Sequence, residues 1–183
     1  MRVFAHKLRN TEGAEIAEAA LVLPVVFVFL LGIIWFGRAF NIYSTIQQAA
    51  QQGAIVAARA TCGTCGSSGG NQFPTGTTVA GAVTSVMQAS SLDPNQILLF
   101  PASTPATCAA PTNNITVCQQ VLLNPPPSST QIQSCGSPPD PTPSQICGSM
   151  VTFQYPFQFY LPFTSLNLSQ VILTAQAQSR MED

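Results

Sequence analysis

An uncharged apolar run from Ala19 to Gly37 constrains the fold of this chain more than any other feature of its sequence. Most of the run reads LVLPVVFVFLLGIIWF. A helix of this length extends about 28 Å, close to the roughly 30 Å hydrocarbon core of a bilayer. The run is longer than the apolar region of a secretory signal peptide, and Arg38 would stand at the centre of the cleavage site. We therefore expect a transmembrane helix that stays in the mature protein.

Basic residues are concentrated before this run. Arg2, Lys7 and Arg9 precede it, whereas only Arg38 follows closely. By the positive-inside rule, the N-terminus should lie in the cytoplasm and the rest of the chain outside. The sequence therefore predicts a single-pass protein of the cytoplasmic (inner) membrane.

The helical pattern continues beyond the apolar run. Small and apolar residues recur at helical spacing opposite a face of glutamines. The apolar face comprises Ile42, Ile46, Ala49, Ala50, Gly53 and Ala57, and the glutamines are Gln47, Gln48, Gln51 and Gln52. We predict one helix from Ala14 to about Ala60, kinked at Pro24 because proline frees a backbone carbonyl.

A separate folded part should follow this helix. Residues 61–76 read TCGTCGSSGGNQFPTG, and such a Gly- and Ser-rich segment is typical of a turn or linker. The chain is thus divided into a basic leader at 1–13, the helix at 14–60, the linker at 61–76 and an exported domain at 77–183.

The periodicity of the exported domain predicts a small α+β fold. A helical stripe runs from about Thr77 to Ser91 and should end at Asp93 and Pro94. Alternating residues predict a strand at 151–163 and a last strand from 171. Pro156 and Pro162 should break the first of these strands or confine it to an edge. We expect the strands to form an antiparallel sheet packed on the long helix.

One face of the strand at 151–163 is strongly aromatic. It carries Val151, Phe153, Tyr155, Phe157, Phe159, Leu161 and Phe163. The simplest interpretation is that this face belongs to the core. The alternative is an exposed docking or ligand surface.

Six cysteines lie on the C-terminal side of the apolar run. They are Cys62, Cys65, Cys108, Cys118, Cys135 and Cys147. Their even number outside a membrane favours disulfides that staple the domain, with 15 possible pairings among which the sequence does not choose. The alternatives are a zinc centre or a redox pair at Cys62 and Cys65. A zinc centre would lack a second CxxC and a nearby histidine, so we expect no metal site.

The charge distribution argues against nucleic-acid binding and against catalysis. No Lys or Arg occurs between Arg59 and Arg180, so no basic patch can neutralise phosphates there. Only Asp93 and Asp140 are acidic in that stretch, and the single histidine, His6, lies in the leader. General acid-base chemistry lacks its usual groups. We expect no enzymatic activity, no cofactor and no small-molecule substrate.

Two carboxylates stand at the start of the apolar run. Glu18 directly precedes it, and Glu15 lies three residues earlier on nearly the same helical face. An ionised carboxylate in lipid costs several kcal/mol unless a partner or the headgroup layer compensates it. Both residues could simply lie in the interfacial zone, or Glu18 could have a specific partner.

The residues around Glu18 resemble those of a prepilin. Gly13 precedes Ala14, and cleavage between them would make Glu18 the fifth residue of the mature chain. The leader MRVFAHKLRNTEG followed by AEIAEAALVLPVVFVFLLGIIWFGR resembles in particular the TadE-like family of tight-adherence (Flp-type) pilus assembly proteins. The ending VILTAQAQSRMED is similar to that of the family. The chain departs from the pattern at Ala19, where the family often has Phe or Tyr.

The resemblance implies cleavage between Gly13 and Ala14 by a prepilin peptidase, an aspartyl membrane protease. Cleavage would create an α-amino cation at Ala14 within reach of Glu18 in a neighbouring subunit. The opposite charges would compensate each other, so Glu18 is expected to set the register between packed helices. The expected partners are the membrane, the peptidase, other pilin-like subunits and pilus assembly proteins.

Two functions follow from these features. The sequence favours a minor pilin or pseudopilin that helps to assemble a tight-adherence pilus or a related secretion system by helix packing. The alternative is a membrane-anchored extracellular binding module with a disulfide-stapled domain.

Overall fold

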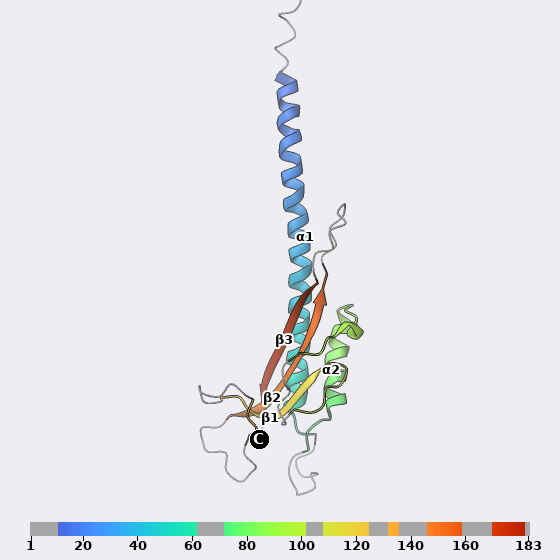
Figure 1. Cartoon of the computed structure of the whole chain (residues 1–183), viewed down its shortest axis with the longest axis vertical. Helices are drawn as coiled ribbons and strands as arrows, with labels where there is room; N and C mark the ends of the chain where they lie inside the picture. Colours follow the sequence, from blue (N-terminus) through green and yellow to red (C-terminus); the bar gives the residue numbers. More distant parts are fainter. Residues whose placement is uncertain are drawn as a thin grey trace, which may run out of the picture. The chain divides into compact units, whose positions relative to one another are not determined.

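A computed structural model describes residues 11–61, 72–101, 108–124, 132–135, 146–158 and 170–181. The chain divides into two units, Met1–Phe40 and Asn41–Asp183. Its elements are helix α1 (Thr11–Ala58), helix α2 (Gly76–Ala89), the 3-10 helix η1 (Pro94–Gln96) and strands β1 (Thr116–Leu122), β2 (Cys147–Phe157) and β3 (Val171–Arg180) (Figure 1). The predicted α+β fold, with a long N-terminal helix, a second helix and a small antiparallel sheet, is confirmed.

Helix α1 is 48 residues long and continues through Pro24. It begins three residues before the predicted start at Ala14 and ends two residues before Ala60. Because proline has no N–H, the carbonyl of Ala20 lacks the usual partner four residues ahead. The part of α1 up to Phe40 belongs to the first unit, and the remainder belongs to the second.

The three strands form one antiparallel sheet in the order β1-β2-β3. Strand β2 pairs with β3 along the whole of β3, from Val171 to Arg180. Strand β1 pairs only with the first part of β2, and its ladder ends at the pair Thr116↔Thr152. In the second unit, Figure 1 shows the strands and α2 beside the C-terminal part of α1.

Pro156 lies inside a continuous central strand, so the expectation that it would break the strand or confine it to an edge was wrong. The physical reason is local. Beyond the end of β1, the N–H and C=O of Gln154 turn away from β3 and bond Leu98. Residues i and i+2 point the same way in a strand, so the N–H that Pro156 lacks would also face away from β3. The pairing of Pro156 with Ile172 in β3 is retained.

The predicted small-residue face of α1 forms the core of the second unit. Its buried members are Ile46, Ala49, Ala50, Gly53 and Ala57, and Ala54, which was not in the predicted face, is buried with them. They pack with buried residues of α2 and of the sheet, among them Val79, Val83, Met87, Val151, Phe153 and Ala175. Gly53 marks the closest approach, because a Cβ added there would lie 2.6 Å from Val83 Cγ2 and 3.5 Å from Val151 Cγ1. Small side chains thus allow α1 to pack directly against α2 and β2.

The described part of the aromatic face belongs to this unit's buried interior. Phe153, Tyr155 and Phe157 are 0%, 5% and 3% exposed. The core interpretation is confirmed for these three residues, and the alternative of an exposed docking surface is wrong for them. Pro162 and the rest of the predicted face, from Phe159 to Phe163, lie outside the described residues.

Helix α2 is held at its start by a cap and ends earlier than predicted. The Thr75 side chain accepts a hydrogen bond from the Thr78 N–H at 3.4 Å, which satisfies an otherwise unpaired helix donor. At the other end Ser91 adopts a φ of 60°, a left-handed conformation that stops the helix at Ala89. Asp93 does not end α2. Its carboxylate accepts from the Asn95 N–H and caps η1.

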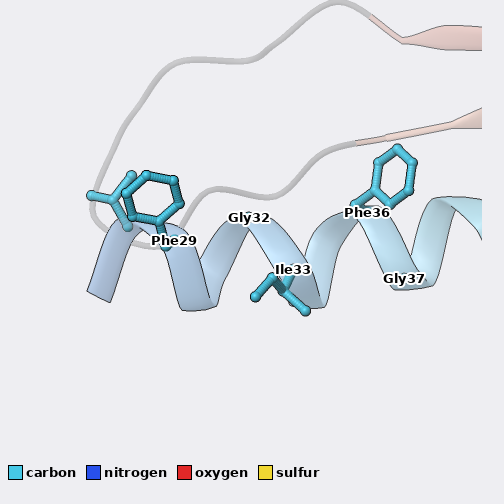
Figure 2. A pocket seen from close by; sticks show the side chains of 6 residues that line it. Phe29, Gly32, Ile33, Phe36 and Gly37 are labelled. Atoms are coloured by element: carbon cyan, nitrogen blue, oxygen red, sulfur yellow. The ribbon is translucent and has the colours of Figure 1, made fainter. Parts of the chain in front are cut away.

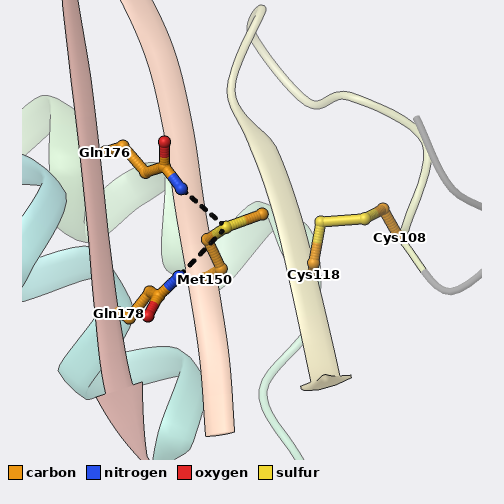
Figure 3. Close-up of a disulfide and its surroundings, with 5 residues drawn as sticks. All are labelled: Cys108, Cys118, Met150, Gln176 and Gln178. Carbon is orange, nitrogen blue, oxygen red and sulfur yellow. Dashed lines mark hydrogen bonds between the residues drawn. A yellow bond between two sulfur atoms is a disulfide. The ribbon is translucent and has the colours of Figure 1, made fainter. Parts of the chain in front are cut away.

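Two disulfides staple the region around β1. One disulfide joins Cys108 to Cys118, which lies in β1, and the other joins Cys135 to Cys147, the first residue of β2. Figure 3 shows the Cys108–Cys118 disulfide beside Met150. The Met150 sulfur accepts hydrogen bonds from the side-chain amides of Gln176 at 3.0 Å and Gln178 at 3.8 Å. The disulfide-stapled character of the domain is therefore confirmed. Cys62 and Cys65 lie outside the described residues.

We predict that Cys108, Cys118, Cys135 and Cys147 resist alkylation in the folded protein because their sulfurs are joined in pairs. Iodoacetamide treatment of the unreduced chain, followed by peptide mass spectrometry, should find these four residues unlabelled. Treatment after reduction in denaturant should label all four. Labelling without reductant would show that the thiols are free in the native protein.

Candidate functional site: the exposed apolar surface of helix α1

The first unit exposes an unusual amount of apolar surface. Fourteen large hydrophobic side chains between Ile16 and Phe40 are at least 48% exposed, including Leu21 at 72% and Phe36 at 75%. Transferring one such side chain from water to an apolar medium is worth about 1.5–3 kcal/mol, so the whole surface favours lipid or apolar partners by tens of kcal/mol. A helix that is apolar all round is typical of a membrane span. Among the described residues, α1 is long and apolar enough to cross a membrane, over Ile16–Ala58.

Charged residues mark both ends of this surface. Glu18 precedes the uncharged run and is exposed. At the other end the Arg38 guanidinium carbon lies 5.8 Å from the centroid of the Trp35 ring, a cation-π contact. Trp and Arg are favoured where a membrane helix leaves the hydrocarbon. The chemistry of the two ends therefore fits a span limited by Glu18 and Arg38.

A shallow apolar groove lies on this part of α1. It is lined by Val28, Phe29, Gly32, Ile33, Phe36 and Gly37. Figure 2 shows the rings of Phe29 and Phe36 on the same side of the helix, with Gly32 between them. A Cβ added at Gly32 or Gly37 would meet nothing within 4 Å, so packing among the described residues does not require either glycine. The groove offers a surface to apolar partners and no polar group for a substrate.

The predicted site residues are placed as follows. Gly13 and Ala14 lie in the first turns of α1, and their side chains are outside what the structure describes. Glu18 is exposed one turn further along the helix. Four of the six candidate cysteines form the two disulfides. In the described ranges, no three His, Cys, Asp or Glu residues come together in a way that could hold a metal ion.

Sequence reasoning did not single out two features of this surface. One is the contact of Trp35 with Arg38, which their i, i+3 spacing could have suggested. The other is the groove around Gly32, for which a glycine flanked by phenylalanines three and four residues away was the available signal. Both features lie between the residues that the sequence had already marked as the apolar run.

Among the described residues, a helix long and apolar enough to cross a membrane is joined to a disulfide-stapled α+β domain, which fits the class of single-pass membrane proteins. Residues 13–54 match the family model described as TadE-like protein, and this match confirms the resemblance noted in the sequence over that segment. The match begins at Gly13 and covers α1 as far as Ala54, whereas the sheet lies outside it. The comparisons with curated proteins and with solved structures gave no match. A TadE-like segment indicates involvement in the tight-adherence pilus system and association with the membrane.

Proposed function

We propose that this protein is a minor pilin or pseudopilin that helps to assemble a tight-adherence pilus or a related secretion system. The observation that carries the proposal is the exposed apolar surface of α1, which begins beside Glu18 and lies within the TadE-like segment. Such a surface is stable in lipid or against other apolar helices. The protein would therefore act by packing and needs no catalytic group.

The proposed mechanism begins with processing of the leader. A prepilin peptidase would cleave between Gly13 and Ala14, leaving an α-amino cation close to the start of the apolar surface. In a neighbouring subunit, Glu18 would supply the opposite charge at the same depth. An isolated charge in lipid is penalised more than a charge that faces an opposite one, so the pair selects one stagger between adjacent helices.

The proposed topology follows from the charge distribution. The leader carries Arg2, Lys7 and Arg9 and would remain in the cytoplasm before cleavage. The second unit, with its disulfides, would then fold on the outer side of the cytoplasmic membrane, where thiols are oxidised. Other pilin-like subunits and assembly proteins would meet the chain there.

We predict that the mature chain begins at Ala14. Purification from the producing cells, followed by intact-mass and N-terminal peptide mass spectrometry, should show loss of the first 13 residues. The Gly13→Leu variant should keep Met1, because a bulky residue replaces the small one before the cut. An intact Met1 in the unaltered protein, or a start well away from Ala14, would favour a membrane-anchored binding module instead.

A further inference from the structure

Among the described residues, strand β3 forms an open edge of the sheet. Gln154 and Thr174 are partners in the β2-β3 ladder, and Gln154 turns its N–H and C=O toward Leu98. In an antiparallel ladder the two members of such a pair both turn away from each other, so the N–H and C=O of Thr174 point outward. The N–H and C=O groups of every second residue of β3 point outward in the same way. The outward set is Ile172, Thr174, Gln176, Gln178 and Arg180.

These outward groups are almost entirely without partners in the part of the chain that the structure describes. Only the Thr174 carbonyl accepts a hydrogen bond, from the side-chain amide of Gln47 in α1 at 3.3 Å. The side chains of all five outward residues are exposed. Within the described ranges, the edge is thus open to another strand.

The opposite edge of the sheet is covered. The Ala109 N–H donates to the Val117 carbonyl at 3.1 Å, and the Cys135 N–H donates to the Gln120 carbonyl at 2.7 Å. The two disulfides tie the covering segments to the sheet, because they include Cys108 and Cys135. Proteins commonly protect exposed edges, and the described segments of this chain protect the β1 edge but not the β3 edge.

Strand β3 also lacks the residues that usually prevent edge pairing. It contains no proline and no lysine, and its only charge is Arg180 at the last position. Thr and Gln occupy the outer face, whereas Ala175 and Ala177 occupy the buried face. Pairing with an uncharged extended segment therefore meets neither a like charge nor a bulky side chain along most of the strand.

A second copy of this chain does not fit the open edge as an antiparallel partner. Two contacts give the direction of β3 relative to α1. Near the start of β3, Thr174 accepts a hydrogen bond from Gln47 of α1. Near its end, Ser179 pairs with Ser149, whose hydroxyl donates to the carbonyl of Ala54, further along α1, at 3.1 Å. Strand β3 therefore runs in the same direction as the 41–58 part of α1. Antiparallel pairing of two β3 strands would point those helix segments in opposite directions, which conflicts with two copies inserted in the same sense in one membrane. The β1 edge of a second copy is already covered.

We propose that the β3 edge receives an extended segment of a different exported subunit as a fourth strand of the sheet. The segment is uncharged where it faces Ile172 to Gln178 and carries an acidic residue near Arg180. Main-chain hydrogen bonds supply most of the affinity, since every second facing pair in an antiparallel ladder exchanges two. The choice of a different subunit rests on the proposed function, because it assumes the membrane anchor. The observation that the edge is open among the described residues does not rest on the proposed function.

The edge can be probed with a labelled synthetic peptide of sequence VILTAQAQSR, which has no anchor and can pair antiparallel. Full-length protein in detergent micelles should bind it, and Gln176→Pro should weaken binding about tenfold through the loss of one or two main-chain hydrogen bonds. Gln176→Ala keeps the N–H and should bind within about twofold of the unaltered protein. Pro156 shows that this sheet already accommodates a proline whose missing N–H faces away from its paired strand. Equal affinity of the proline and alanine variants would overturn the proposal.

A second measurement avoids any change to the protein. Amide hydrogen exchange followed by NMR should slow at Thr174, Gln176 and Gln178 when the peptide binds, whereas the inward amides of Ala175 and Ala177 should not change. Equal protection of both sets, or of neither, would contradict edge pairing. An intact Met1 in the mature chain would contradict the proposed function but would not change the pattern of amide protection. Failure of the proposed function and failure of edge pairing can therefore be distinguished.

The identity of the occupant is tested in the producing cells. A photo-crosslinking residue placed at Gln178 of the full chain should form an adduct with another exported pilus subunit. The same residue at Gln88, exposed on α2, is the matched control and should not form that adduct. An adduct between two copies of this chain would show that the edge is occupied by self-pairing and would overturn the assignment.

Discussion

Replacing Glu18 with alanine should reduce incorporation of the protein into its assembly complex by more than about tenfold, while membrane insertion stays intact. The variant would leave the proposed α-amino cation of Ala14 without its counter-charge, and breaking a buried ion pair costs about 3–5 kcal/mol. Insertion depends instead on the apolar surface of α1, which the change does not reduce. Co-purification of the variant with its partners from solubilised membranes, normalised to the amount inserted, measures the effect.

Two further variants separate charge from position. Glu18→Gln keeps a hydrogen-bonding side chain of nearly the same size but removes the charge, and it should fail almost as badly as alanine. Glu15→Ala removes the neighbouring carboxylate three residues earlier and should leave incorporation close to normal. Undiminished recovery of partners with Glu18→Ala would defeat the role assigned to this residue, and equal loss from Glu15→Ala would show that overall charge and not position matters.

The helices were predictable from the sequence because their signals are local. Helix α1 follows from an uncharged run and from small residues repeated at helical spacing, and its buried face is the predicted one. Helix α2 was misplaced only at its ends, since the left-handed turn at Ser91 stops it before Asp93. The sequence offered no signal at Ser91 comparable to that of proline at 94.

The sheet was less predictable because its order depends on contacts between distant residues. Pro156 looked like an edge residue, yet it lies in the central strand where β1 has already ended. The pairing of Cys108 with Cys118 and of Cys135 with Cys147 was one choice among 15, and no local pattern selects it. The open edge of β3 among the described residues belongs to the same category, since it depends on which segments pair with β3 and not on the sequence of β3 alone.

The candidate site shows the same division. Hydropathy and the position of Glu18 predicted where the apolar surface begins and how long it is. The groove beside Gly32 depends on the spacing of Phe29 and Phe36 around the glycine, which hydropathy alone does not show. Within the TadE-like segment, the two kinds of glycine differ: Gly32 faces open space, whereas Gly53 is closely surrounded.

Replacing Gly53 with valine should destabilise the second unit by about 3 kcal/mol or more. A Cβ at this position would lie 2.6 Å from Val83 Cγ2, and Val83 is itself fully buried in the core and cannot move aside freely. The helix, α2 or β2 must shift to relieve the overlap, and overpacked cores lose about 1–3 kcal/mol for even one or two methyl groups. Thermal unfolding of the full-length protein in detergent, followed by near-UV circular dichroism, should show a midpoint lower by about 10 °C.

A pair of alanine variants tests whether crowding, and not the loss of glycine, causes the effect. Gly81 lies in helix α2 and is exposed, and a Cβ there would meet nothing within 4 Å. Gly81→Ala should therefore stabilise the protein by about 0.5–1 kcal/mol, because alanine loses less backbone entropy in a helix than glycine does. Gly53→Ala gains the same helix preference but collides with Val83, so its unfolding midpoint should fall while that of Gly81→Ala rises. Midpoints that move in the same direction would mean that α1 does not pack against α2 as closely as the distances at Gly53 indicate.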